Sequence, residues 1–198
     1  MKLSEAWVAI LRDVSSSGTP INDLTGDYLE LPMLQIDISE FDSDGSLITN
    51  HVPIANINEM RKVFVEGGEN IFGHEYVSLM AQGDQIGRIV KQLLHKPVSR
   101  KAVIALGLVP DVEWVPCINT MHFWIRDGLL HLHYFSRGQD LWTKFVPDIL
   151  AMRVLQSNLA AKLGVTVSPG LIRGVISSAH IYTRDIPNVH KLLRDASL

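Results

Sequence analysis

The spacing of apolar side chains divides the first half of the chain into helices and one long strand. From about Ser4 the apolar positions follow helical spacing, which predicts a short amphipathic helix. Its apolar positions are Trp7, Ile10, Leu11 and Val14. Residues 28–38 alternate well enough to predict a strand with Leu34, Ile36 and Ile38 on one face. Helical spacing returns over 56–64 and 84–95, and we expect a helix in each place.

The second half of the chain predicts strands around one long helix. Residues 114–126 and 129–136 flank Asp127-Gly128, and Asp-Gly between two apolar runs is the strongest short-range hairpin pattern. A long apolar helix follows and ends at Gly164, a residue typical of helix C-caps. Residues 102–108 and 171–182 predict two further strands, and 187–194 a short final helix. The pattern therefore predicts an α+β domain with a mainly antiparallel sheet and one long buried helix.

Composition narrows the class of protein. The 198 residues suit a single domain, and a net charge of −3 excludes an overall basic surface for nucleic acid. The single cysteine, Cys117, permits no intrachain disulfide, as is usual in a reducing compartment. No apolar run is long enough to span a bilayer, and the first 13 residues lack a signal-peptide core. We expect a soluble cytoplasmic protein with no membrane or nucleic-acid partner.

Cys117 is open to two interpretations. An isolated cysteine is by default a small buried apolar residue. Alternatively it is a thiolate nucleophile, which needs nearby cations to lower its pKa. Arg126 and Arg137, further along the predicted hairpin, are the candidate cations, although spacing alone does not bring them close to Cys117.

Three histidines offer a different chemistry on the predicted hairpin. A two-residue turn at Asp127-Gly128 pairs Arg126 with Leu129, Trp124 with His131, and His122 with His133. His122, His131 and His133 then share one sheet face, an arrangement that can bind zinc. Stacking on Trp124 at a half-buried face or interface explains them as well. Because no carboxylate is clearly placed as a further ligand, we predict no metal site.

Two other polar groups have both functional and structural interpretations. Arg137 lies in the segment 136–140 after the second hairpin strand, where its guanidinium suits a phosphate. An ordinary ion pair with Asp140 is the alternative. His180 and Tyr182 share a strand face and can hydrogen-bond one polar ligand together, but core packing explains them almost as well.

Taken together in chain order, these segments resemble the thymidylate synthase family, which includes the cytidylate hydroxymethylases. The resemblance is carried by residues 84–86, 96–104, 115–117, 123–130, 134–140, 147–149 and 179–182. It covers 84–198, whereas 1–75 is a divergent N-terminal part. It implies one thymidylate synthase-like domain over 1–198, whose mixed sheet forms the interface of a homodimer.

The resemblance implies one-carbon transfer to C5 of a pyrimidine nucleoside monophosphate, with 5,10-methylenetetrahydrofolate as the donor. In the family a cysteine thiolate adds to C6 of the base and makes C5 a carbon nucleophile, which attacks the folate methylene and then loses its proton. Synthases finish with a hydride from the folate, and hydroxymethylases add water instead. Cys117 occupies the nucleophile position. A non-catalytic nucleotide-binding dimer on the same scaffold is an alternative.

The resemblance also implies roles for individual residues. Its nucleotide-binding set is Arg100, Lys101, His122, Arg137, Asp140, Asp148, His180 and Tyr182. Arg137 matches a phosphate-binding arginine that helps to activate the thiolate, and Arg100 with Lys101 matches a pair supplied by the partner subunit. His180 and Tyr182 match the pair that holds the sugar hydroxyl, and His122 stands where a glutamine is expected. Glu59 is the candidate for the catalytic glutamate, ahead of Glu66 and Glu69.

Asp148 bears on the choice of base. Uracil-specific members of the family carry asparagine at this position, and cytidylate hydroxymethylases carry aspartate. A carboxylic acid can donate a proton to the unprotonated N3 of cytosine and accept from its N4 amino group. The resemblance therefore favours hydroxymethylation of CMP or dCMP, with methylation of dUMP as the alternative.

Several positions depart from the family pattern. Ile118 replaces a histidine after the nucleophile, Gly138 replaces a phosphate-binding serine, and Thr143-Lys144 replaces a Leu-Gly step under the folate. The chain ends at Leu198, without the C-terminal segment that closes over folate in typical members. A hydroxymethylase, which needs water, is expected to tolerate that loss better than a synthase, which must protect a hydride transfer.

Overall fold

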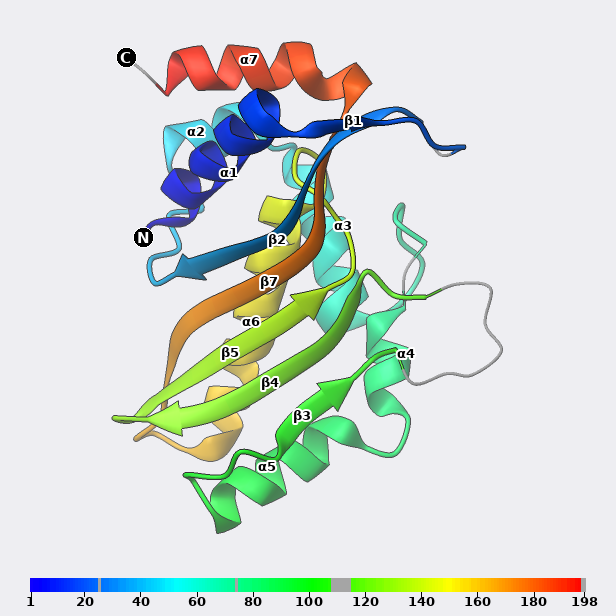
Figure 1. The fold of residues 1–198 in the computed structure, drawn as a ribbon. Coiled ribbons are helices and arrows are strands. Elements are labelled where there is room, and N and C mark those ends of the chain that lie inside the picture. Colours follow the sequence, from blue (N-terminus) through cyan, green and yellow to red (C-terminus); the bar gives the residue numbers. More distant parts are fainter. Residues whose placement is uncertain (25, 74, 108–114, 197–198) are drawn as a thin grey trace.

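The computed structural model describes residues 1–24, 26–73, 75–107 and 115–196, and it forms an α+β domain built on a seven-stranded mixed sheet (Figure 1). The strand order is β1-β2-β7-β5-β4-β3, and β6 pairs with β7. The strands are β1 (Thr19–Ile21), β2 (Tyr28–Ile38), β3 (Ala102–Ala105), β4 (Ile118–Arg126), β5 (Leu129–Ser136), β6 (Gln139–Asp140) and β7 (Ser168–Tyr182). The helices are α1 (Leu3–Ser17), α2 (Ser46–His51), α3 (Ile54–Arg61), α4 (Tyr76–Ala81), α5 (Gln85–His95), α6 (Phe145–Leu163) and α7 (Ile186–Asp195). Lys62–Glu66 continues α3 as a π-helical turn, and Thr183–Asp185 is a 3-10 turn before α7.

The β4–β5 hairpin forms in the predicted register. Arg126 lies opposite Leu129, Trp124 opposite His131, and His122 opposite His133. Asp127 and Gly128 have φ angles of 53° and 72°, so both central residues of the turn are left-handed. This is the turn whose twist matches antiparallel strands, which is why Asp-Gly predicts it well. The hairpin prediction is confirmed.

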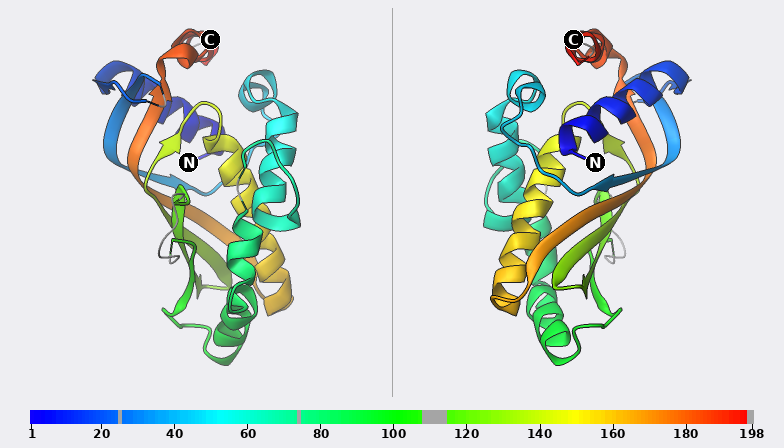
Figure 2. Two further views of the ribbon diagram at one scale, coloured as in Figure 1. Left: turned by 90° about the vertical axis from the view of Figure 1, so that its right-hand side faces the viewer. Right: turned by 90° about the vertical axis from the view of Figure 1, so that its left-hand side faces the viewer.

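The long helix α6 supplies the centre of the core. It crosses behind the sheet in Figure 1, and the side views place it with α3 and α5 on one side of the sheet (Figure 2). Apolar side chains on several sides of α6 are buried, which suits a helix packed between a sheet and other helices. Gln156 is also fully buried, and its amide donates to the carbonyl of Leu130 (2.7 Å). The predicted buried helix is confirmed, and it starts at Phe145.

The opposite face of the sheet stays partly open. Strand side chains alternate between buried positions toward α6 and half-buried or exposed positions on the other face. We call the second set the outer sheet face, and on the hairpin it comprises Thr120, His122, Trp124, His131, His133 and Phe135. In Figure 2 the helices α3, α5 and α6 all lie on the other side.

The structure refines several predicted boundaries. The helices α2 and α4 have six residues each, too short for a helical repeat of apolar positions to predict them. The strand expected over 102–108 ends at Ala105, and its predicted last residue, Leu108, lies outside the described residues. The predicted start of the first hairpin strand, Trp114, lies there too, and β4 begins at Ile118. Among the helices of the described ranges, none is long and apolar enough to cross a membrane.

Gly174 in β7 allows a large ring to enter the core. The side chain of Tyr134 is fully buried, and it crosses directly over the glycine. A Cβ at position 174 would lie 2.5 Å from Cε1 and Cζ of the Tyr134 ring and 2.7 Å from its hydroxyl oxygen. These separations are far inside van der Waals contact, so the glycine is needed for close approach rather than for its backbone angles.

We expect Gly174→Ala to lower the free energy of unfolding by about 1–3 kcal/mol, the usual cost of overpacking a rigid core. Urea denaturation of both proteins measures the difference. Gly138→Ala is the matched control, because the nearest atom to its new Cβ is 3.8 Å away. Equal stability of Gly174→Ala and the wild type would contradict this account of the Tyr134 packing.

Candidate active site

Cys117 lies directly before β4, where the ends of β4 and β5 meet. The backbone N–H of Arg137 donates to the Cys117 carbonyl (2.9 Å), and the Ser136 hydroxyl donates to the same oxygen (3.0 Å). These two bonds fasten the cysteine to the residues that end β5 and follow it. The Cys117 side chain is half-buried. The hairpin therefore holds the thiol next to the polar segment that follows β5.

The Arg137 side chain folds back along the chain that precedes Cys117. Its Nη2 donates to the Val115 carbonyl (2.8 Å), and its Nε lies 3.2 Å from the carbonyl oxygens of Val115 and Pro116. Burial raises the pKa of the Cys117 thiol, and the charges of Arg137 and Lys144 oppose that rise without cancelling it. Arg137 thus acts on the thiol in the expected direction, but burial outweighs it.

Asp148, in the first turn of α6, places a buried carboxyl within electrostatic reach of Cys117. Only 6% of this residue is exposed. Its Oδ2 accepts a hydrogen bond of 2.7 Å from the Gln139 amide. Burial raises the pKa of the Asp148 carboxyl to about 7, against the lowering effects of Lys144 and Gln139. Near neutral pH this group is present in both its acid and its ionised form.

Asp140 shapes the connection between the sheet and α6. Its Oδ1 accepts hydrogen bonds from the backbone N–H groups of Trp142 and Thr143, each 3.0 Å long. The next carbonyl, that of Leu141, accepts from the indole N–H of Trp7 (2.7 Å). The Asp140 carboxylate therefore stabilises the turn that brings Asp148 to the site.

His180 and Tyr182 lie together at the end of β7, and Tyr28 from β2 joins them. The ring centroids of His180 and Tyr182 are 5.3 Å apart, and that of Tyr28 lies 5.2 Å from His180. Burial lowers the pKa of the His180 imidazole and so favours its neutral form. The backbone N–H of Leu141 donates to the His180 carbonyl (2.9 Å), so this aromatic group adjoins the Asp140 turn.

Glu59, the candidate catalytic glutamate, lies on α3. Its carboxylate accepts hydrogen bonds from Lys62 Nζ (2.5 Å) and from the backbone N–H of Ile71 (3.1 Å). These bonds lower the pKa of the Glu59 carboxyl, the Lys62 bond having the larger effect. Phe72, next to Ile71, has the Lys144 ammonium 5.5 Å from its ring centre, which links this segment to the cations around Cys117. Of the alternatives, Glu66 pairs with Arg61 (2.7 Å) and Glu69 is exposed.

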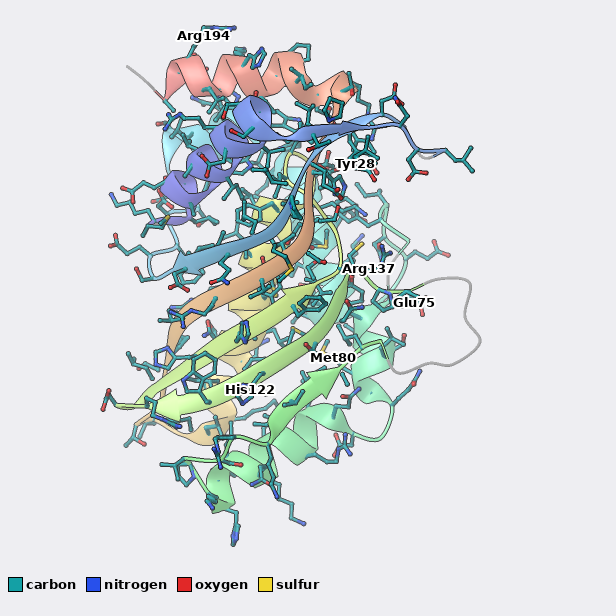
Figure 3. The ribbon with its side chains drawn as sticks, viewed as in Figure 1. Tyr28, Glu75, Met80, His122, Arg137 and Arg194 are labelled. Atoms are coloured by element: carbon teal, nitrogen blue, oxygen red, sulfur yellow. The ribbon has the colours of Figure 1, made fainter. Side chains whose placement is uncertain are left out.

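The structure does not bring Arg100, Lys101 and His122 to Cys117 within one chain. Arg100 and Lys101 are exposed just before β3, whose first residue, Ala102, pairs with Phe123. Phe123 is five positions along β4 from Ile118, or roughly 17 Å at the rise of an antiparallel strand. Figure 3 likewise shows His122 and Arg137 at separate places along the hairpin.

The three hairpin histidines pack around an aromatic ring. Trp124 stacks on His131 (5.3 Å between ring centroids) and lies 5.5 Å from His122. Burial lowers the pKa of His122, His131 and His133, so the neutral forms are favoured. Over the part of the chain that the structure describes, no group of three or more His, Cys, Asp or Glu side chains is arranged to hold a metal ion. The stacked arrangement on Trp124 is the one observed.

Three residues near the candidate site were not predicted from the sequence. Tyr28 reaches His180 only because β2 pairs with β7, a contact without a local pattern. The buried Tyr76 hydroxyl accepts from the backbone N–H of Ile118 (3.4 Å), and α4, which carries it, is too short to predict. Gln139 lies within a segment that resembles the family, but its bond to Asp148 depends on the turn into α6.

Comparisons with known proteins identify the family to which this fold belongs. Residues 56–197 match the family model described as "Thymidylate synthase". The "Putative thymidylate synthase" of Methanosarcina barkeri (strain Fusaro / DSM 804) is 27% identical over 201 residues, which cover 97% of this chain and 92% of that protein. The protein of the same name from Methanopyrus kandleri is 31% identical over 133 residues, covering 63% and 60%. The "Thymidylate synthase" of Bacillus licheniformis is 28% identical over 110 residues, covering 54% and 39%.

The structure defines the class of protein as an α+β domain with a mixed sheet, in which a cysteine lies beside an arginine and a buried carboxyl. Since the family model matches more than half of its residues, the chain belongs to the thymidylate synthase family. This membership makes it a one-carbon transferase acting on pyrimidine nucleotides. The predicted family and fold are confirmed, and the match begins at residue 56, earlier than Asp84, where the recognisable segments begin.

The raised pKa of Asp148 predicts how stability depends on pH. The folded protein binds a proton at this carboxyl up to about pH 7, whereas the unfolded chain releases it near the ordinary value of 3.8. The free energy of unfolding should therefore fall as the pH rises from about 4 to 7, by up to about 4 kcal/mol from this group. Asp148→Asn should remove that slope. Urea denaturation at several pH values, compared between the two proteins, tests it, and parallel curves would contradict the assignment.

Proposed function

We propose that this protein transfers a one-carbon unit from 5,10-methylenetetrahydrofolate to C5 of a cytidine nucleoside monophosphate, CMP or dCMP, and forms the 5-hydroxymethyl product. The observation that carries the choice of base is the buried Asp148 carboxyl, whose pKa is raised to about 7 and which lies within electrostatic reach of Cys117. Family membership supports the general reaction, and Asp148 supports the cytosine substrate.

The acid form of Asp148 is complementary to cytosine when its proton is on the oxygen that faces N3. Cytosine presents an acceptor at N3 beside an amino donor, and a neutral carboxyl presents one donor and one acceptor. Uracil presents an N–H donor at N3 beside a carbonyl acceptor. To match uracil, the carboxyl would need its proton on the other oxygen. An ionised carboxylate could accept from N3–H but would face the O4 oxygen of uracil with a second acceptor. Burial therefore supports discrimination, because it keeps the acid form available up to neutral pH.

The other candidate residues have distinct proposed roles around that base. The Cys117 thiolate adds to C6, and a bound phosphate on Arg137 would sit beside the cation that favours this thiolate. His180 and Tyr182 hold the sugar, and Tyr28 supports their rings from β2. Glu59, whose carboxyl pKa is lowered, has the proposed role of accepting or relaying protons during the transfer.

The segment beside Glu59 has the features that a folate requires. Ile71 is 67% exposed, and with the half-buried Phe72 it offers an apolar surface for a pterin ring. The Lys144 ammonium over the Phe72 ring adds a positive charge that suits the anionic glutamate end of a folate. When bound, the folate supplies the one-carbon unit at the oxidation level of formaldehyde.

A homodimer accounts for the residues that lie apart from Cys117 in one chain. The outer sheet face carries Trp124, Phe135 and the stacked histidines, with no helix of the described ranges over them. Two copies joined through this face by a two-fold axis would bury it in a self-complementary interface. Arg100 and Lys101, exposed at the edge of that sheet, would then reach the phosphate in the site of the other copy.

Release of tritium from 5-tritiated CMP, dCMP, UMP and dUMP, with and without methylenetetrahydrofolate, tests the proposed function. We expect folate-dependent release from a cytidine nucleotide, because C5 loses its proton in the reaction, and no release with Cys117→Ser. Asp148→Ala should remove the preference for the cytidine nucleotide, by about tenfold or more, since it removes the buried donor and acceptor that match cytosine. The mass of the product identifies the group added.

Methylation of dUMP is the second candidate, and the names of the matched relatives favour it. Release only from dUMP, with a methylated product, would establish it and overturn the proposed substrate. No folate-dependent release from any of the four nucleotides would overturn both and leave a nucleotide-binding dimer.

Mixed dimers test whether Arg100 serves the partner subunit. When Cys117→Ser and Arg100→Ala chains are mixed equally and exchange freely, half of the dimers are mixed. Each mixed dimer has one intact site of its two, so activity should recover to about a quarter of the wild-type value. Lys91→Ala, another exposed cation on the nearby α5, should be fully active by itself. Activity no higher than the mean of the two parent variants would show that Arg100 acts in its own chain or not at all.

A further inference from the structure

A buried chain of hydrogen bonds stands behind the Asp148 carboxyl. The Tyr134 hydroxyl donates to Oε1 of Gln139 (3.2 Å), and Nε2 of Gln139 donates to Oδ2 of Asp148 (2.7 Å). The exposed fractions of Tyr134, Gln139 and Asp148 are 0%, 3% and 6%. Because the three side chains are shielded from water, each polar atom depends on its protein partner.

The Tyr134 hydroxyl determines which way the Gln139 amide faces. Burial raises the pKa of the Tyr134 phenol well above its ordinary value, so the hydroxyl keeps its proton and needs an acceptor. Within the described residues its hydrogen bond is to Gln139. If the amide were reversed, Tyr134 would face an NH₂ group and its own hydrogen would have no acceptor, which is costly in a buried site. The amide oxygen therefore faces Tyr134, and the NH₂ group faces Asp148.

This orientation makes the two oxygens of the Asp148 carboxyl unequal. An N–H group from Gln139 points at Oδ2, so that oxygen must act as an acceptor. When the carboxyl is neutral, its proton is consequently on Oδ1. No protein group of the described ranges donates to Oδ1, so its hydroxyl is available to a ligand.

We propose that Gln139, oriented by Tyr134, is a specificity-determining positioning residue that places the Asp148 proton on Oδ1, where it can be donated to N3 of a cytosine ring. This inference rests on the proposed function for the identity of the base, whereas the placement of the proton rests on the hydrogen bonds alone. Oδ2 keeps a free lone pair and accepts from the N4 amino group. Without the amide, the proton could occupy either oxygen, and the carboxyl would match the base in only one of its two forms.

The surrounding sheet is built to hold this arrangement. The backbone of Gln139 is paired with Ala179 in β7, which prevents the side chain from moving with a flexible loop. Gly174, also in β7, leaves the space that the Tyr134 ring needs to reach Gln139. Tyr134 and Gln139 are thus both held in place by the same central strand.

Titration of the Asp148 carboxyl tests the arrangement without any substrate. The protein is labelled with ¹³Cγ-aspartate, and the Asp148 signal is identified by its loss in Asp148→Asn. Gln139→Met should raise the apparent pKa of Asp148 by about one unit or more, because it removes the donor that stabilises the anion. Tyr134→Phe, which conserves the ring, should give a smaller rise because the amide is no longer oriented.

Gln156→Met is the matched control for loss of a buried glutamine. Gln156 is fully buried and bonded to backbone carbonyls, but it lies eight residues beyond Asp148 on α6, roughly 12 Å along the helix. Its replacement should alter stability while leaving the Asp148 titration unchanged. An Asp148 pKa that is the same in Gln139→Met and the wild type would overturn the proposed arrangement.

Binding of CMP and UMP at pH 6, and of their deoxy forms, tests the effect on specificity. Gln139→Met should reduce the ratio of cytidine to uridine affinity by roughly tenfold, and Gln156→Met should leave the ratio unchanged. A shifted Asp148 pKa with an unchanged ratio would overturn the specificity role. If the wild type bound neither nucleotide, the proposed function would fail and the specificity role with it, while the titration would still decide how the proton is placed.

Discussion

The candidate site depends on the pairing of β7, which lies at the centre of the sheet. β7 runs antiparallel to β2 and parallel to β5, and it also pairs with the two residues of β6. These three pairings bring together Tyr28, the end of the Cys117 hairpin, Gln139 and the His180–Tyr182 pair. The turn stabilised by Asp140 then directs α6 so that Asp148 reaches the same place. If β7 slipped by one residue in this register, its own side chains, among them His180 and Tyr182, would point to the other face and leave the group.

Burial is the dominant electrostatic influence on the two central groups. It raises the pKa of the Cys117 thiol and of the Asp148 carboxyl, so the free protein favours the uncharged form of both at the lower end of the physiological range. For the carboxyl this is useful, because only the neutral acid can donate a proton to a base. For the thiol it is a cost, since the thiolate is the nucleophile. Arg137 and Lys144 reduce that cost, because their positive charges oppose the rise in the pKa of the thiol.

The sequence predicted best what depends on neighbouring residues. The strand over 28–38 and the register of the Asp127-Gly128 hairpin agree with the structure, because both follow from local alternation and turn chemistry. The family and the roles suggested for Cys117 and Asp148 came from ordered motifs, and no local pattern would have supplied them. Tyr28 and Gln139 were missed because their importance arises from a strand pairing and a turn far from them in the chain. Charge balance at Cys117 could not be predicted either, since it depends on how deeply the thiol is buried.

The pairing of β2 with β7 also has a consequence for the order of assembly. Tyr28 and Tyr182 lie opposite each other although 154 positions separate them in the chain, from 28 to 182. The β4–β5 hairpin closes over two residues and can form early, whereas a contact of such long range forms late because closing a long loop costs entropy before it gains contacts. In a nascent chain the hairpin that follows Cys117 can thus form before the His180–Tyr182 pair lies near it.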